Sequence, residues 1–224
     1  MRWRSWGWYV LAAIVMAGVT ADVLADGPLR HLDWTVHRFY DADVRGGWMS
    51  VVGVFTQLGQ RGVIVEYVLV PLAVLGVLRT RSPRPALVPF AVVVLLSLLQ
   101  IGVKSVIPRT YPYGNTDVLW THGDAYPSGH TLNGFLLIWV AVELLVIVVP
   151  ALGRRLTARA RRDAALVTGF LTGASLTLAD EHWLTDVLFS LALGPVLLTG
   201  LVAADPFTRR LWPGEPVRAG YPRI

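Results

Sequence analysis

Three short polar stretches in an otherwise apolar chain carry side chains suited to nucleophilic and proton-transfer chemistry. The first contains Lys104, the only lysine; the second is a Pro-Ser-Gly-His turn ending at His130; the third holds His182 and Asp186, four residues apart. On a helix, residues i and i+4 lie on one face, so Asp186 can accept the Nδ1–H of His182. That bond would fix the tautomer, leave Nε2 free and make the ring a better nucleophile or base.

The elements that must position these side chains are predicted to be membrane helices. The chain has 224 residues, of which 54% are hydrophobic and 16% charged, with a mean hydropathy of +0.53. A soluble domain carries about 25% charged residues, and several apolar runs reach the roughly 20 residues that cross a bilayer. We therefore expect an all-α integral membrane protein with one domain over residues 1–224. Cysteine is absent, which excludes disulfides and thiolate metal sites.

Six transmembrane helices are predicted as a bundle, with boundaries good to about two to four residues. They lie at about residues 6–25, 54–78, 86–106, 128–150, 164–181 and 183–204. Between the first two, residues 28–46 have the pattern of an amphipathic interfacial helix. The first helix also resembles a signal peptide, but its apolar stretch is close to span length, which favours a retained helix.

The basic residues predict the orientation of the bundle. Fourteen of the 20 lysines and arginines lie in residues 1–4, 79–85, 153–163 and 205–224. By the positive-inside rule these segments, both termini and the tail at 205–224 are cytoplasmic. The net charge of +5 therefore reflects the membrane and indicates no nucleic-acid partner. All five histidines fall on or near the other side, so the predicted chemistry is extracytoplasmic: His31, His37, His122, His130 and His182.

Each polar stretch alone has a structural explanation. Pro-Ser-Gly before an apolar run is an ordinary helix start, and a His-x-x-x-Asp pair often caps a helix or forms half of a metal site. A lysine at a membrane edge often snorkels to the surface. The joint occurrence of all three stretches at one depth and on one side favours a shared site.

The three stretches together resemble the motifs of the type 2 phosphatidic acid phosphatase superfamily. This family includes membrane lipid phosphatases, haloperoxidases and phosphotransferases, and its pattern is Lys-x6-Arg-Pro, then Pro-Ser-Gly-His, then Ser-Arg-x5-His-x3-Asp. The matching positions are Lys104 and Pro112 for the first motif, residues 127–130 for the second, and Ser175, His182 and Asp186 for the third. The resemblance covers about residues 50–204.

The resemblance implies a mechanism that uses neither a metal nor another cofactor. His182 would attack phosphorus and form a phosphohistidine, while Asp186 orients the ring. His130 would protonate the departing lipid alkoxide and then activate the water that releases phosphate. Phosphoryl transfer depends mainly on positioned charge and an in-line nucleophile, which two histidines and nearby cations can supply.

The resemblance also implies a set of phosphate-binding groups. Lys104, Ser128 and the Gly129 amide would bind the phosphate oxygens, aided by the amino end of the fourth helix. Ser175 belongs to the third motif and is expected in the same pocket.

Both motif arginines of the family are replaced in this chain. Tyr111 stands in place of the first arginine and Leu176 in place of the second. The loss of two guanidinium groups removes charge-assisted hydrogen bonds that are hard to replace. Arg109, two residues before Tyr111, and Arg61, at the outer entry of the second span, are the candidate substitutes.

Acidic residues are unusual neighbours for a phosphate pocket. Four of them lie in the outer loops: Asp117, Asp124, Asp180 and Glu181. The simplest interpretation is that they are solvated loop charges. Alternatively, they select a cationic or polyhydroxylated acceptor, or bind a divalent ion carried by a diphosphate substrate.

The sequence thus favours hydrolysis of a membrane lipid phosphate or diphosphate, phosphatidate-like or polyprenyl, within the lipid bilayer of the cell membrane. One alternative is a phosphotransferase that passes the headgroup to an alcohol. Another is a non-catalytic lipid-binding or transport protein. Glu66 and Glu143 favour the last, because intramembrane carboxylates mark proton or ion paths.

Overall fold

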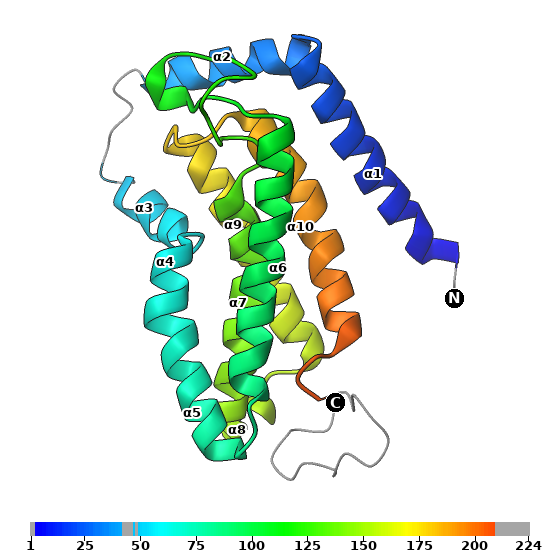
Figure 1. Cartoon of the computed structure of the whole chain (residues 1–224), viewed down its shortest axis with the longest axis vertical. Coiled ribbons are helices and arrows are strands. Elements are labelled where there is room, and N and C mark those ends of the chain that lie inside the picture. Colours follow the sequence, from blue (N-terminus) through cyan, green and yellow to red (C-terminus); the bar gives the residue numbers. More distant parts are fainter. Residues whose placement is uncertain (1–2, 42–46, 48, 209–224) are drawn as a thin grey trace.

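The computed structural model describes residues 3–41, 47 and 49–208, and helices make up most of this part of the chain. The elements in chain order are α1 (Trp3–Leu24), α2 (Pro28–Asp41), α3 (Met49–Gln57), α4 (Arg61–Ile64), the π-helical turn η1 (Val65–Leu69), α5 (Val70–Thr80), α6 (Arg84–Val106), the 3-10 turn η2 (Pro112–Gly114), α7 (Gly129–Val148), α8 (Pro150–Gly153), α9 (Ala158–Leu178) and α10 (Leu184–Ala204). The long helices stand side by side, α2 lies across their upper ends, and α1 leans away from the bundle (Figure 1). The predicted all-α fold is confirmed.

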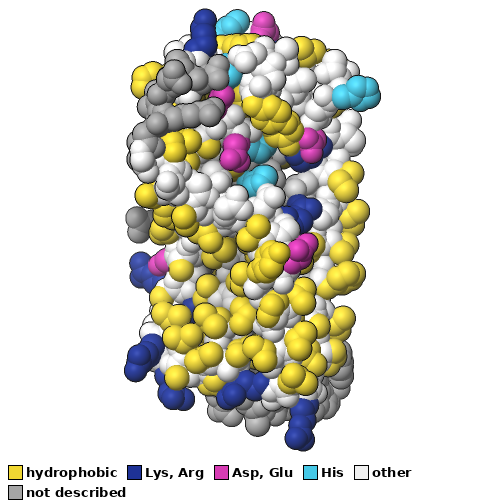
Figure 2. All heavy atoms as spheres, turned by 90° about the vertical axis from the view of Figure 1, so that its left-hand side faces the viewer, with side chains coloured by type: hydrophobic (Ala, Val, Ile, Leu, Met, Phe, Trp, Pro, Cys, Tyr) yellow, Lys and Arg dark blue, Asp and Glu magenta, His cyan; other side chains and the backbone are white. Residues whose placement is uncertain are grey.

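Five helical segments in the described part of the chain are long and apolar enough to cross a membrane. They are Trp6–Leu24, Arg61–Thr80, Arg84–Val106, Gly129–Val148 and Leu184–Ala204. The sixth predicted span corresponds to α9, whose first turn carries Arg159, Arg161 and Arg162, and the six-span count stays a prediction. Figure 2 shows a broad apolar band on one face, with histidine and acidic side chains above it and Lys and Arg side chains at the lower end.

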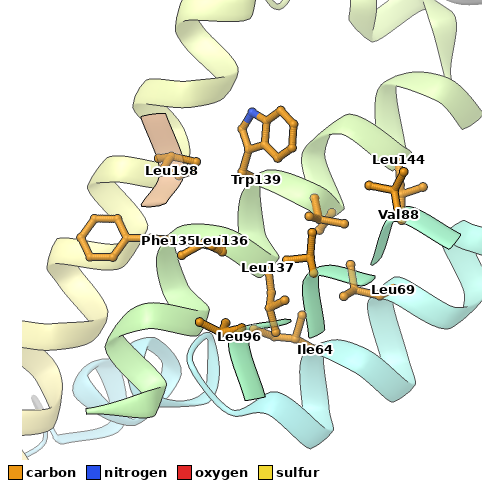
Figure 3. Close-up of a cluster of buried hydrophobic side chains, with 14 of the residues drawn as sticks. Ile64, Leu69, Val88, Leu96, Phe135, Leu136, Leu137, Trp139, Leu144 and Leu198 are labelled. Carbon is orange, nitrogen blue, oxygen red and sulfur yellow. The ribbon is translucent and has the colours of Figure 1, made fainter. Parts of the chain in front are cut away.

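Helix α7 is the centre of the bundle. Its apolar window is 72% buried, whereas those of the other four candidate spans are between 17% and 28% buried. Its side chains meet those of α4, η1, α6 and α10 in the core shown in Figure 3: Phe135, Leu136, Leu137, Trp139 and Leu144 with Ile64, Leu69, Val88, Leu96 and Leu198. Because His130 lies in the first turn of α7, the best-packed helix carries one of the predicted catalytic side chains.

The second membrane helix begins at Arg61, several residues later than expected. The chain breaks after α3 because Gly59 lies directly against α7. A Cβ at Gly59 would stand 2.6 Å from the carbonyl oxygen of His130. Asn133 Nδ2 donates a hydrogen bond to the Gly59 carbonyl at 2.9 Å. This turn therefore places Gln60 and Arg61 beside the start of α7.

The predicted amphipathic helix is present as α2, across the ends of the membrane helices (Figure 1). Residues 42–46 of the predicted segment and residues 209–224 of the predicted tail lie outside the described residues. Phe39 is 62% exposed, whereas Asp33 and His37 are buried. Asp33 and His37 thus face the protein, while His31 and Arg38 of the same helix are exposed.

The carboxylate predicted in the middle of the fourth span has a partner. Glu143 Oε1 accepts a hydrogen bond from Arg161 Nε at 2.7 Å, and Arg161 also donates to the Leu156 carbonyl. A buried carboxylate that is paired with an arginine in this way helps to hold two helices together and needs no role in ion transport. It weakens the transport interpretation, because Glu143 is engaged in packing α9 on α7.

Candidate active site

The first turn of α7 and the loop before α10 bring the two predicted catalytic histidines together. The ring centroids of His130 and His182 are 6.0 Å apart, with 63° between the ring planes. In-line transfer needs a nucleophile about 3–3.5 Å from phosphorus and an acid about 2.6–3.2 Å from the departing oxygen. The present separation is shorter than the sum of these distances and the bond between phosphorus and that oxygen, so the two rings share one pocket but must part to admit a phosphoryl group between them. The Ser128 amide also donates to the Asp186 carbonyl at 3.2 Å, which ties the two motifs together.

The His182–Asp186 pair has a different geometry from the one expected. His182 lies two residues before the start of α10, so the two side chains do not share a helix face. Asp186 Oδ2 caps this helix by accepting the Trp183 amide at 3.2 Å. The same oxygen is 3.5 Å from His182 Nδ1, longer than a hydrogen bond. That nitrogen is buried without a hydrogen-bond partner in the described part of the chain, so the carboxylate is close enough to bond it after a small shift, as in many unliganded active sites.

Gln60 contacts His130 and was missed in the sequence. Its Oε1 lies 2.6 Å from His130 Nε2. Because a carbonyl oxygen accepts, this contact places a proton on Nε2. No local pattern points to Gln60, since the two residues are 70 positions apart in the chain.

Two positively charged side chains lie near the histidines: Arg61 follows Gln60, which contacts His130, and Lys104 shares the Asp124 carbonyl with Tyr111, which lies beside His182. Lys104, in the last turn of α6, donates from Nζ to the carbonyl oxygen of Asp124 and is 3.7 Å from its carboxylate. Arg61 donates to Ser97 Oγ at 2.8 Å and to Gln100 Oε1 at 2.5 Å. The geometry therefore brings Arg61, one of the two candidate substitutes, to the histidines and the lysine.

Gln100 belongs to α6, and its side chain reaches the first residue of α7. A Cβ on Gly129 would stand 2.8 Å from Gln100 Oε1, so a side chain there would displace Gln100 from this position. Ser128 caps the helix by accepting the Thr131 amide at 3.4 Å, while the first amides of α7 have no intrahelical acceptor. Gln100 Nε2 is buried without a partner among the described residues. A signal for it exists in the sequence, because it precedes Lys104 by four residues on one helix.

Arg109 does not face this pocket. Its side chain is fully buried, and its five N–H groups all donate within the protein: Nε and Nη2 to Asp117 (2.8 and 2.9 Å), Nη1 to Thr185 (2.7 Å) and Asp186 (2.8 Å), and Nη2 to Asp33 (2.7 Å). A guanidinium has five donors, so none is left for phosphate. The expectation that Arg109 replaces a phosphate-binding arginine is therefore wrong, and Arg109 instead holds the carboxylate of Asp186.

This buried cluster contains three carboxylates and two guanidinium groups. Asp33, Asp117 and Asp186 all contact Arg109, whereas Arg30 contacts only Asp117 among them, at 2.7 Å. Burial acts to lower the pKa of Arg109, but the surrounding carboxylates outweigh it and raise that pKa above its usual value. Burial acts to raise the pKa of Asp117, yet hydrogen bonds from both arginines hold it below its usual value. For Asp33 burial prevails and raises the pKa to about 6.

Tyr111 lies beside His182, where the family pattern has an arginine. The two ring centroids are 5.3 Å apart, and Tyr111 stacks on Tyr113 at 5.2 Å. Its hydroxyl donates to the Asp124 carbonyl at 3.2 Å, and burial raises the pKa of the phenol. Tyr111 therefore lines the pocket as a neutral side chain. Ser175 is buried in α9, and its place in the pocket stays a prediction.

The acidic loop residues fall into two groups. Asp124 and Glu181 are exposed, as solvated charges should be. The side chain of Asp117 is only 1% exposed, and Asp180 lies 2.9 Å from His37 Nδ1, so the expectation of solvated charges is wrong for these two. No three His, Asp or Glu side chains are grouped to hold a metal ion within the described ranges.

Comparisons with known proteins identify the fold and the family of the chain. A crystal structure described as the first transmembrane PAP2 type phosphatidylglycerolphosphate phosphatase from Bacillus subtilis has a TM-score of 0.67 and 20% sequence identity, covering 92% of this chain and 98% of that one. This likeness shows a shared fold. No curated protein sequence matches the chain significantly. The family model of the PAP2 superfamily matches residues 85–210, more than half of the chain. The chain therefore belongs to the PAP2 superfamily.

Proposed function

We propose that the protein is a membrane lipid phosphatase that hydrolyses a lipid phosphate or diphosphate through a phosphohistidine. The observation that carries this proposal is that the two motif histidines meet, with the His130 and His182 ring centroids 6.0 Å apart and Arg61 next to Gln60, which contacts His130. Membership of the PAP2 superfamily supports the same class of enzyme, a lipid phosphatase-like hydrolase.

The reaction runs in two steps on the two imidazoles. In the first, Nε2 of His182 attacks phosphorus, the bond from phosphorus to the lipid oxygen breaks, and His130 gives its proton to that oxygen. In the second, His130 takes a proton from water as the water attacks the phosphohistidine, and phosphate leaves. Asp186, next to Nδ1 of His182, stabilises the positive ring that forms in the first step, and the ring returns to neutral when the bond from phosphorus to Nε2 breaks in the second.

The phosphate oxygens are bound by groups from three helices. Lys104 and Arg61 supply positive charge, the buried Nε2 of Gln100 supplies a neutral donor, and the Gly129 amide supplies the end of the α7 dipole. Donors fixed in place before the reaction stabilise developing charge without reorganisation. Arg61 and Gln100 take over the task of the absent motif arginines.

A lipid substrate is supported by the surroundings of the pocket. An apolar groove of about 550 Å³ adjoins the turn that carries Gln60 and Arg61, and Gln57, Leu58 and Val63 are among the residues lining it. A lipid chain lying there would bring its phosphate to Arg61. Both phosphatidate-like and polyprenyl phosphates have such a chain, so both classes belong in the test.

The test is phosphate release from phosphatidate, phosphatidylglycerol phosphate, and prenyl mono- and diphosphates by the purified protein in detergent. We expect His182→Ala to abolish turnover and His130→Ala to reduce it by about 10²–10⁴-fold, the usual effect of a general acid–base group. His122→Ala is the matched control, because His122 is an exposed histidine of the same outer loops. All three variants are checked for folding by thermal unfolding.

Full activity of folded His182→Ala or His130→Ala would refute the mechanism. Product formation that needs an alcohol acceptor and releases no free phosphate would identify a transferase. A phosphorylated wild-type protein, trapped with radiolabelled substrate and labile in acid, would support the phosphohistidine.

A further inference from the structure

Helix α2 buries two polar side chains, one acidic and one basic. Asp33 and His37 are 1% and 2% exposed. They are four residues apart, so they share one helix face. Burying a polar group costs free energy unless the group is hydrogen-bonded. His37 contacts Asp180, which follows α9, and Asp33 contacts Thr185 at the start of α10.

Asp33 binds the end of that segment where α10 begins. Its Oδ1 accepts the Thr185 amide at 2.9 Å, and its Oδ2 accepts the Thr185 hydroxyl at 2.6 Å. Oδ2 also accepts a hydrogen bond from Arg109 at 2.7 Å, and Arg109 in turn donates to Asp186 Oδ1. Asp33 therefore fixes the residue before Asp186 and orients the guanidinium that holds its carboxylate.

His37 binds the other end of the segment, where α9 has ended. Its Nδ1 lies 2.9 Å from both carboxylate oxygens of Asp180, and its ring packs on Trp34 and Trp183 at 5.5 Å each. Asp180 has a φ of 56°, a left-handed conformation that is uncommon outside glycine. The contact with His37 thus holds an unusual backbone turn two residues before His182.

We propose that α2 positions the catalytic segment, with Asp33 and His37 holding residues 180–186 at both ends. Neither residue touches the reacting atoms, so both are positioning residues. The inference rests on the proposed roles of His182 and Asp186. Holding both ends sets the gap between His182 Nδ1 and Asp186, now 3.5 Å, and the angle at which His182 faces His130. A misplacement of about 1 Å in such a site costs about 10²-fold in rate.

The test compares buried and exposed side chains on the same helix. Asp33→Asn removes the acceptor that Thr185 Oγ1 and Arg109 share, and His37→Leu removes the contact with Asp180. His31→Leu is the matched control because His31 is exposed on α2. We expect the first two to lower kcat by about 10- to 100-fold with KM close to wild type, since Lys104 and Arg61 are untouched. The control should retain the wild-type kcat.

A conservative variant separates positioning from general destabilisation. His37→Asn keeps an N–H donor near the place of Nδ1 and should recover part of the kcat lost in His37→Leu at equal thermal stability. Should His37→Leu fail to fold, Asp33→Asn and His37→Asn decide the matter by their kcat relative to His31→Leu.

The inference and the proposed function fail in different ways. Wild-type kcat in folded Asp33→Asn and His37→Leu, or a change confined to KM, overturns the positioning role while inactive His182→Ala leaves the phosphatase standing. Activity in His182→Ala removes the proposed function itself.

Discussion

Arg61 and Arg109 show that the partners of a side chain, and not its type, decide what it can do. Arg109 uses every N–H group on protein acceptors in a buried cluster. Arg61 is half-buried and donates to Ser97 and Gln100 beside the pocket. Of the two, only Arg61 stays a candidate for phosphate binding.

Removing the charge of Arg61 should therefore weaken catalysis. A hydrogen bond to a charged group contributes about 1.5–3 kcal/mol, so we expect Arg61→Gln to lower kcat/KM by about 10- to 150-fold. Arg79→Gln is the matched control, because Arg79 is exposed at the far end of the same span. Steady-state phosphate release measures both. Equal kcat/KM in the two variants would show that Arg61 is not a phosphate ligand.

At the scale of elements, α2 and the loop before α7 build a charged cluster around the carboxylate of Asp186, the proposed partner of His182. Asp33, Asp117 and Asp186 all face Arg109. Burial raises the pKa of Asp33 to about 6, because the charge of Arg109 and the hydrogen bonds from Thr185 and Arg109 offset the cost of burial only in part. The helix that positions the site thereby makes stability depend on pH.

The dependence has a definite sign. Between about pH 4 and pH 6 the folded protein keeps a proton on Asp33 that the unfolded chain has released. The stability from this group is present below the unfolded pKa and is lost as the pH rises through the folded pKa. We expect Asp33→Asn, which does not titrate, to gain stability relative to wild type by up to about 3 kcal/mol over that range. Thermal unfolding in detergent at pH 4, 5 and 6 measures this, and a constant difference would contradict the shift.

At the scale of the whole molecule, charge and apolar surface are segregated along the bundle. Histidine and most acidic side chains lie toward the upper end of the visible face, whereas the charged side chains at its lower end are Lys and Arg (Figure 2). The loop before α7 and the loop between α9 and α10 lie at the end covered by α2 (Figure 1). The positive-inside rule predicts that this end faces away from the cytoplasm.

The orientation has a direct test because the chain contains no cysteine. Thr121→Cys and Arg155→Cys introduce single thiols at exposed positions on opposite ends of the bundle. A membrane-impermeant maleimide added to intact cells should label Thr121→Cys, whereas Arg155→Cys should react only after lysis. The reverse pattern would place the site on the cytoplasmic side.

What the sequence determined by itself is what depends on neighbours along the chain. A bilayer demands continuous apolar helices, so the helical membrane fold follows from runs of residues. Pro-Ser-Gly-His marks the start of α7, and Ser128 caps that helix as its position predicts. The motif spacings likewise pointed to His130 and His182, which the fold brings together.

What only the tertiary structure decided is which distant groups meet. Gln60 reaches His130 across 70 residues and Asp33 reaches Thr185 across 152, while Arg109 turns inward to carboxylates from α2, α10 and its own loop. Hydrogen bonds and ion pairs act over a few ångströms in space and carry no trace in local periodicity. Their partners are fixed only when the helices pack, and it is this packing that assigns Arg61 to the pocket and Arg109 to the support of Asp186.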